Sequence, residues 1–364
     1  MSDLDKAWDN FLKNKNVDII QKKKICKHIP KCSNIYISTQ TKIAFMNQVF
    51  DLEKIFWKLS ILKYQERQEG ILKKQMKINC NTQAESERLE ERIKKEEMVI
   101  IDVISKIDNP NARRIKYKDI RKINVGIAKK DLTSYRKKRK GAFYNCIVLI
   151  MRLKMGDKFK EVHLKLFNTG KLEIPGIQSN IFLYKALDKL ITILQPFCEN
   201  TLFYNAMEIE TVLINSNFSC DYYIDRNILY NILKYNYKIA AIYDPCSYPG
   251  IQCKFYYNKN NTSQNGLCNC VEKCSKKGGT GEGPGQCLSV SFMIFRTGSV
   301  LIVGHCDEQV IMIVYDFLKD LLARECPNIY THSHDKIIKT KTKKIWKKYI
   351  LSSIQPVNKT LVSI

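Results

Sequence analysis

The chain has 364 residues, of which 45% are hydrophobic, so it is long enough for one large domain or two ordinary ones with a sizeable core. Its formal net charge of +25 and its pI near 9.4 favour a polyanionic partner, either nucleic acid or an acidic membrane surface; a general excess of lysine from an AT-rich genome is the alternative explanation. The N-terminus lacks a signal-peptide pattern and no apolar run is long enough to span a membrane, which predicts an intracellular protein without a membrane partner.

A basic and weakly patterned segment, 1–33, precedes the first half of the chain. A β-branched alternation then predicts a strand over 35–45. The next stretch predicts a helix, because Asp51 is a good N-cap and four apolar side chains after it fall on one helical face: Leu52, Ile55, Phe56 and Leu59.

An insertion at about 63–140 interrupts this order. A capping box, Thr82 to Glu85, predicts a helix, and the run MVIIDVISKI, 98–107, favours a strand. From 113 to 140 there are 13 Lys and Arg against two Asp. Such a run fits phosphate contact, although a charge run is more often a solvated face.

Beyond the insertion, the sequence CIVLIMRLK at 146–154 predicts a buried strand. The stretch LKLFNTGKLEIPG, 164–176, then predicts a hairpin, with an apolar strand, a Phe, a Thr-Gly turn, a second strand and a closing Gly. A helical pattern starts at Ile181. We place this half at 34–200.

The second half, 201–326, repeats the same order. It has a predicted strand over 209–218 and a Pro249–Gly250 turn that leads into another strand. Between them lies a helix capped by Asp225, whose apolar face consists of Ile228, Leu229, Ile232 and Leu233.

A Cys/Gly-rich insertion occupies about 258–288. The stretch FMIFRTGSVLIVG, 292–304, then repeats the hairpin of the first half, and a helical pattern follows it from Val310. A lysine-rich tail, 327–364, ends the chain. Two copies of one strand-turn-strand-helix unit predict a fold with pseudo-two-fold symmetry.

The 14 cysteines favour free thiols or a metal site over a disulfide framework in an intracellular protein. Four of them lie in the Gly-rich insertion with a Cys-x-Cys-x3-Cys spacing and a distal fourth, which would suit a structural zinc ion: Cys268, Cys270, Cys274 and Cys287. Cys246 and Cys253 lie nearby in the sequence. The usual Cys-x2-Cys pairs are absent, and a loop of free thiols is the alternative.

Nothing in the sequence indicates an enzyme. The run KKGGTGEGPG lacks the Gly-Lys-Ser/Thr ending of a phosphate-binding loop and no helix start follows it. The five histidines are scattered, and no Ser-His-Asp or carboxylate constellation stands out. We therefore expect a protein that binds rather than catalyses.

The repeated order resembles the TATA-binding protein family, in which each half has a strand, a DL-type helix start, a VIMR-like strand, an IFxSGK turn, a TG-ended strand and a long helix. The corresponding stretches are DLEKI (51–55), LIMRL (149–153), LFNTGK (166–171), YPGI (248–251) and IFRTG (294–298). The resemblance covers about 34–62, 141–200 and 205–326, and the insertions look most like those of the divergent relatives encoded by large DNA viruses.

This resemblance implies an α+β saddle, in which a curved antiparallel sheet has helices on its convex face. Such a sheet binds the minor groove of duplex DNA, inserts aromatic wedges between base steps and bends the duplex. By position, the wedges are Phe167, Phe295 and Tyr248, and the fourth falls near Cys146 or on Phe143 or Tyr144.

The resemblance also implies the residues that contact DNA between the wedges. Those on the groove floor are Thr39, Thr41, Thr211, Leu213, Asn215, Met293, Leu301 and Val303. Candidate phosphate contacts are Arg152, Lys171 and Arg296. Three positions where the family has apolar or Thr contacts to the groove are occupied differently here, by Lys165, Glu173 and Pro175. We expect Lys165 to neutralise the carboxylate of Glu173.

The function implied is a transcription initiation factor that binds A·T-rich promoter DNA as a monomer and recruits general initiation factors and RNA polymerase. No cofactor is required beyond the structural zinc considered above, and the site of action would be the host nucleus or a cytoplasmic viral factory. One alternative is a saddle-fold interaction scaffold that no longer reads DNA, which Glu173 and Pro175 favour. Another is an enzyme with a saddle-like substrate-binding domain.

Overall fold

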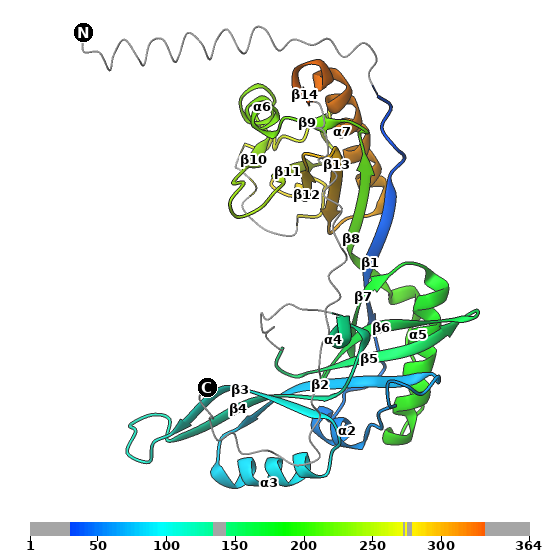
Figure 1. The fold of residues 1–364 in the computed structure, drawn as a ribbon, viewed down its shortest axis with the longest axis vertical. Coiled ribbons are helices and arrows are strands. Elements are labelled where there is room, and N and C mark those ends of the chain that lie inside the picture. Colours follow the sequence, from blue (N-terminus) through cyan, green and yellow to red (C-terminus); the bar gives the residue numbers. More distant parts are fainter. Residues whose placement is uncertain (1–29, 134–142, 272–273, 275–278, 332–364) are drawn as a thin grey trace, which may run out of the picture. The chain divides into compact units, whose positions relative to one another are not determined.

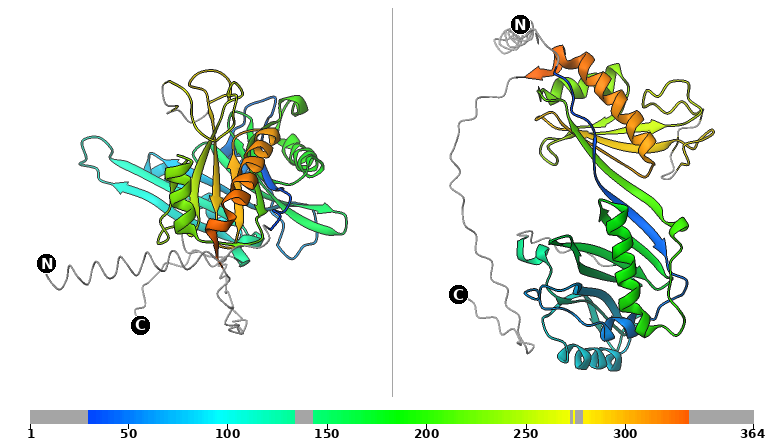
Figure 2. Two further views of the ribbon diagram at one scale, coloured as in Figure 1. Left: turned by 90° about the horizontal axis from the view of Figure 1, so that it is seen from above. Right: turned by 90° about the vertical axis from the view of Figure 1, so that its right-hand side faces the viewer.

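The computed structural model of the chain describes residues 30–133, 143–271, 274 and 279–331. The described residues form two compact units, 40–210 and 30–39 with 211–331, which we call the first-repeat and second-repeat units. In each unit, helices pack on one face of an antiparallel sheet (Figures 1 and 2). The predicted α+β class is thereby confirmed.

The first-repeat unit has the predicted strands, hairpin and helices, in the predicted order. From the end of β1 (Tyr36–Phe45), neighbouring strands follow in the order β7, β6, β5, β2, β4 and β3, with every pair antiparallel. The bounds are β2 Gly70–Cys80, β3 Val99–Asp108, β4 Tyr117–Gly126, β5 Cys146–Met155, β6 Lys158–Phe167 and β7 Lys171–Ile177, with helices α2 Leu52–Lys58, α3 Gln83–Lys94, α4 Lys129–Thr133 and α5 Asn180–Leu194.

The caps expected from the sequence are present. The side chain of Asp51 accepts a hydrogen bond from the N–H of Lys54, and that of Thr82 accepts one from the N–H of Glu85. The carboxylate of Glu85 returns to the N–H of Asn81, one residue before the position that a capping box requires. The apolar face predicted after Asp51 is buried in the core of the unit.

The insertion at 63–140 does more than interrupt the repeat. Two of its strands, β2 and β4, were not predicted, and β2 pairs directly with β5 while β4 pairs with β2. The insertion therefore widens the sheet of the first-repeat unit by three strands, with β3 at the free edge. The lysines of β2 obscured its alternation, because they occupy two outward positions, Lys73 and Lys77, and also one buried position, Lys74.

The second-repeat unit has the strand order β10, β11, β12, β13, β8 and then the beginning of β1. Its bounds are β8 Glu210–Ser219, β10 Ala240–Ile242, β11 Ile251–Tyr257, β12 Leu288–Ile294 and β13 Ser299–Gly304, with helices α6 Arg226–Asn231 and α7 Glu308–Ile329. A separate pair of two-residue strands joins β9 Tyr223–Ile224 to β14 Tyr330–Thr331.

The helices of this unit differ in detail from the prediction. Asp225 caps α6 as expected, but a π-helical turn takes over at Ile232 and leaves Ile228 exposed, while Leu229 and Leu233 are buried. Helix α7 extends to Ile329, past the boundary that we placed at 326. Within the described residues, neither α7 nor any other helix combines the length and the apolarity that crossing a membrane requires.

Candidate nucleic-acid interface and metal centre

The face of each sheet opposite its long helix, α5 or α7, is called the open face. In the first-repeat unit the short helix α4 lies over one end of this face, where Asp131 pairs with Lys73 and the N–H of Lys129 donates to Glu161. In the second-repeat unit, Ile302 and Phe218 belong to the core that packs against α7, so the residues alternating with them point to the open face. Five groove residues inferred from the resemblance lie there: Leu213, Asn215, Met293, Leu301 and Val303. Asn217, directly opposite Leu301, extends the row by the same period of two.

Amide and hydroxyl groups complete this row. The side-chain amide of Asn215 donates to the hydroxyl of Thr39, at 3.2 Å, which fixes the orientation of both groups. Thr211 lies further along the open side of β8 and is partly buried. The described open-face positions of β8, β11, β12 and β13 include no carboxylate. Apolar side chains mixed with small polar ones, without negative charge, suit the acceptor-rich minor groove.

An aromatic pair stands at one end of this open face. The rings of Tyr248 and Phe295 have centroids 5.9 Å apart, and Gly250 lies beneath them, where a Cβ would approach both rings to about 3 Å. The hydroxyl of Tyr248 contacts the sulfur of Met293 at 3.4 Å. Both rings are partly buried but neither belongs to the core, so each keeps some exposed surface at this end of the open face.

The first-repeat unit has a matching pair. The ring of Phe167 packs edge-on against that of Phe143, with centroids 6.4 Å apart. Strand register makes Tyr144 the counterpart of Tyr248, because Ile147 and Ile251 occupy equivalent positions in the two sheets and each lies three residues after one of these tyrosines. In the structure it is Phe143 that packs against Phe167, whereas the ring of Tyr144 lies under Lys77, whose Nζ is 3.4 Å from the ring centroid.

The two Thr-Gly turns place the Phe residues in the same way. Gly170 and Gly298 both have φ near +80°, and a Cβ on either would collide with a backbone carbonyl oxygen, that of Gln48 or of Tyr222 respectively. Each turn is closed by a hydrogen bond from the glycine N–H to the carbonyl of the wedge Phe, three residues earlier. Only glycine therefore fits, which explains why both repeats have it.

The open face of the first-repeat unit is more polar. Lys165 and Glu173 lie opposite each other on β6 and β7, and their side chains form an ion pair of 2.6 Å, as we expected. The Lys165 ammonium also lies 4.9 Å from the ring centroid of Phe143. Lys171 and Pro175 lie on the same face of β7, because the residues alternating with them are buried.

Three other predicted contacts have distinct surroundings. Arg296 is exposed beside its wedge, with its guanidinium over the ring of Tyr223, and is well placed for a phosphate. Arg152 is buried, and its guanidinium donates to the carbonyls of Glu66 and Tyr64, which does not favour phosphate contact. Thr41 is only 9% exposed and lies at the bulge of β1, which limits its reach to a ligand.

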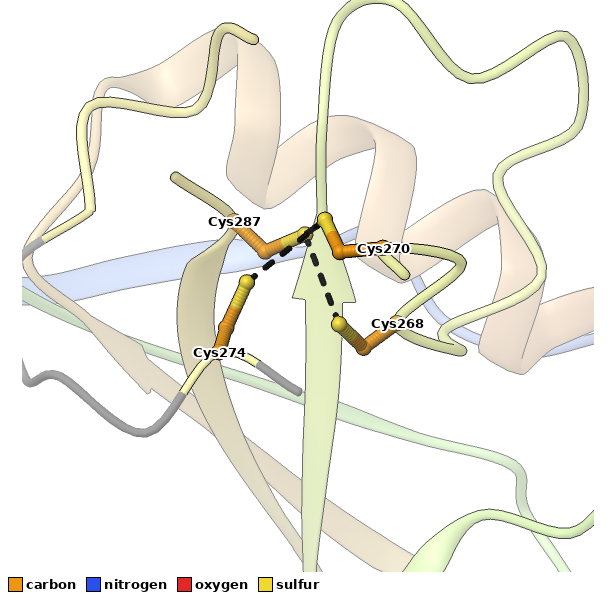
Figure 3. Close-up of side chains that lie close together, drawn as sticks. All are labelled: Cys268, Cys270, Cys274 and Cys287. Carbon is orange, nitrogen blue, oxygen red and sulfur yellow. Dashed lines mark hydrogen bonds between the residues drawn. The ribbon is translucent and has the colours of Figure 1, made fainter. Parts of the chain in front are cut away.

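The four cysteines of the second insertion converge in the structure (Figure 3). Their sulfur atoms all lie within 4.8 Å of one another, with separations of 3.6 Å for Cys270–Cys287, 3.6 Å for Cys270–Cys274 and 3.9 Å for Cys268–Cys287. Four thiolates at about 2.3 Å from a tetrahedral zinc ion are separated by about 3.8 Å. The spacing is therefore that of a zinc site and too long for disulfides.

Donors around the cluster fit bound thiolates. The N–H of Gly285 donates to the sulfur of Cys270 at 3.2 Å, and the amide of the buried Asn258 lies 3.6 Å from the sulfur of Cys287. Such hydrogen bonds stabilise and orient metal ligands. Cys246 and Cys253 stay apart from the cluster, because Cys246 is exposed in a turn and Cys253 is buried in the core, where burial raises its pKa to about 12.

Some predicted features fall outside the described residues. These are most of the N-terminal segment, the part of the basic run at 134–142, and the C-terminal tail from 332. Of the basic run, Arg113 to Thr133 is described, and it forms the end of the β3–β4 hairpin, β4 and α4.

The fold and the paired aromatic sites describe a two-repeat α+β protein with one open sheet face in each repeat. No family model matches the chain. It is 24% identical over 194 residues to a "TATA-box-binding protein-like" protein of Acanthamoeba polyphaga mimivirus, a match that covers 50% of this chain and 48% of that protein. The chain thus spans about half the length of the curated relative it matches. The resemblance recognised in the repeated hairpins is confirmed by this match.

A solved structure, the TBP of Methanococcus jannaschii, matches with a TM-score of 0.38 and 13% sequence identity. The match covers 80% of this chain and 99% of that one.

Proposed function

We propose that the chain is a transcription initiation factor that binds duplex DNA in the minor groove through the open faces of both units. The observation that carries the proposal is an aromatic pair beside the Thr-Gly turn of each repeat, Phe143 with Phe167 and Tyr248 with Phe295. Rings that lie outside the core at the end of an open sheet face are suited to entering a base step and unstacking it. The net charge of +25 attracts the phosphate backbone.

The open face of the second-repeat unit is better suited to contact the minor groove than that of the first-repeat unit. Its open face combines apolar side chains with the amides of Asn215 and Asn217, whereas the first repeat presents the Lys165–Glu173 ion pair. We propose that A·T-rich DNA is preferred, because the minor groove distinguishes little beyond A·T from G·C and flexible steps there are easily kinked. The saddle arrangement of the two units belongs to this proposal.

The proposal extends to partners, cofactor and location. We propose that the helical faces and insertions recruit general initiation factors and RNA polymerase, that the chain binds DNA as a monomer without catalysing a reaction, and that the four-cysteine cluster holds one structural zinc ion. The site of action would be the host nucleus or a cytoplasmic viral factory. The mimivirus relative supports the transcription role by its name.

The test of this function is a binding titration at several salt concentrations on duplexes of varied sequence. We expect binding that weakens steeply with salt and is tightest on A·T-rich duplexes. Binding to none of the duplexes would favour the alternative, a scaffold of a transcription complex without sequence-specific DNA binding, for which the Glu173 carboxylate is the motivating observation.

Replacing the two partners of the Lys165–Glu173 ion pair one at a time should change DNA affinity in opposite directions. Replacing Lys165 by Met leaves the Glu173 carboxylate unpaired against the negative potential of the groove, so affinity should fall by an amount on the order of 1 kcal/mol or more. Replacing Glu173 by Gln frees the ammonium for DNA, so affinity should rise and the salt slope should steepen by up to about 0.9. Salt titrations of the two variants measure both effects, and a shift in the same direction for both would contradict the groove-facing placement.

A further inference from the structure

The β3–β4 hairpin projects from the sheet of the first-repeat unit, with its loop at the far end (Figures 1 and 2). The loop, 109–116, is closed by a hydrogen bond from the N–H of Asn109 to the carbonyl of Lys116. Arg113, Arg114 and Lys116 are all exposed there, and Lys118 follows at the start of β4. The hairpin therefore presents a concentrated positive charge at its tip, which we call the basic tip.

Strand register places the basic tip at the wedge end of the sheet. Cys146, the first residue of β5, lies opposite the wedge Phe167, and the next residue, Ile147, lies opposite Met76 of β2. From Met76, β2 continues past the start of β5 to Cys80, which lies opposite Asp119 near the start of β4. The hairpin loop thus lies on the side of the sheet where Phe143 and Phe167 stand, and not at the opposite end.

Side chains connect the wedge to the basic tip along the open face. Lys77 lies on this face, because its neighbour in the alternation, Gln75, is opposite the open-face residue Val148. Its ammonium lies over the ring of Tyr144, next to the wedge residue Phe143. On the adjacent strand, Lys122 lies directly opposite Lys77, and Lys118 lies four residues nearer the loop on the same face of β4.

The second-repeat unit has no described counterpart of this hairpin. Its sheet ends at β10, a strand of three residues next to β11, where the first-repeat unit has β2, β4 and β3. The two wedge pairs are similar, but among the described residues only the one in the first repeat has a basic arm beside it.

We propose that the basic tip binds the phosphodiester backbone of duplex DNA just outside the step kinked by Phe143 and Phe167. This inference rests on the proposed function. DNA that leaves a kinked step must pass the wedge end of the sheet, and exposed guanidinium and ammonium groups there match its charge and its phosphate geometry. Because only one repeat has such an arm in the described part of the chain, the contact would protect one flank of the site and give a protein of two similar repeats a single direction on DNA.

The experiment compares hydroxyl-radical footprints of three proteins on one end-labelled duplex. The first is the wild-type chain. The second combines Arg113→Gln, Arg114→Gln and Lys116→Gln. The third is a matched control, Arg88→Gln with Lys94→Gln and Lys95→Gln, which removes as many charges from exposed positions of α3, a helix packed on the covered face of the same sheet.

We expect the wild-type and control footprints to extend further on one flank and the tip variant to lose protection on that flank alone. Its salt slope should fall by up to about 2.7, at up to about 0.9 per lost phosphate contact, with bending unchanged. All six positions are exposed, so thermal unfolding should be the same for the three proteins.

The outcomes separate the inference from the function on which it rests. If the wild-type chain protects and bends DNA and the tip variant matches it in footprint and slope, the inference alone is overturned. If the tip variant keeps its DNA footprint but loses binding to polyglutamate, an acidic protein segment is the partner and the inference is likewise overturned. If the wild-type chain protects no duplex, both the inference and the proposed function are overturned.

Discussion

Replacing both wedge phenylalanines, Phe167→Ala with Phe295→Ala, should abolish most DNA bending and weaken binding by a few kcal/mol. Both rings stand at the end of an open face and pack against a single aromatic partner rather than in the core. Their removal therefore takes away the groups that enter the base step and leaves the fold in place. Energy transfer between dyes at the two ends of a duplex measures the bend.

The matched control is Phe203→Ala with Tyr235→Ala, which removes one exposed aromatic side chain from each unit outside the wedge pairs. We expect this control to bend DNA like the wild-type chain. Unchanged bending in the wedge variant, with both proteins folded by circular dichroism, would reject the minor-groove proposal. Phe143→Ala and Tyr248→Ala should each produce a smaller effect, since each removes a packing partner worth about 1 kcal/mol.

The second large effect concerns the cysteine cluster. Purified wild-type protein should contain about one zinc ion per chain, and Cys268→Ser with Cys274→Ser should contain none, because a structural site needs its full tetrahedron. Structural zinc sites bind with apparent free energies of about 10–16 kcal/mol, so the insertion at 258–288 should lose its order without the ion. Elemental analysis measures the metal, and limited proteolysis measures the order of the loop.

The matched control is Cys198→Ser with Cys246→Ser, two thiols that lie outside the cluster. Its zinc content should equal that of the wild-type chain, and a chelator should give wild-type protein the proteolysis pattern of the Cys268 and Cys274 variant. DNA binding should survive the loss of zinc, since the open faces and the wedges are built from other residues. Zinc retained by the Cys268→Ser, Cys274→Ser variant would contradict the proposed zinc site.

Much of the local structure could be predicted from the sequence. The caps at Asp51, Thr82 and Asp225 formed as expected, and both hairpins formed around their Thr-Gly turns. These features depend on residues close together in the chain, so a short window of sequence contains the information. The period of two in β8 is likewise enough to place Leu213 and Asn215 on one face.

Other features depended on contacts between distant segments. The choice of Phe143 over Tyr144 follows from which ring reaches Phe167, and strand register by itself favours the other residue. The burial of Arg152 depends on two carbonyls more than 80 residues earlier in the chain. Strand β2 joins the sheet by pairing with β5, and β4 joins it by pairing with β2. No local sequence pattern predicts either pairing.

The order of residues alone therefore establishes that the chain consists of two similar strand-turn-strand-helix halves, each with a Phe before a Thr-Gly turn. Periodicity, capping and turn chemistry are local, and they suffice for this much. Long-range packing was needed to show that four cysteines across a 20-residue loop meet at zinc-site spacing, and that the basic tip lies at the wedge end of the sheet. Both depend on strand register and loop closure, which bring together residues that the sequence keeps apart.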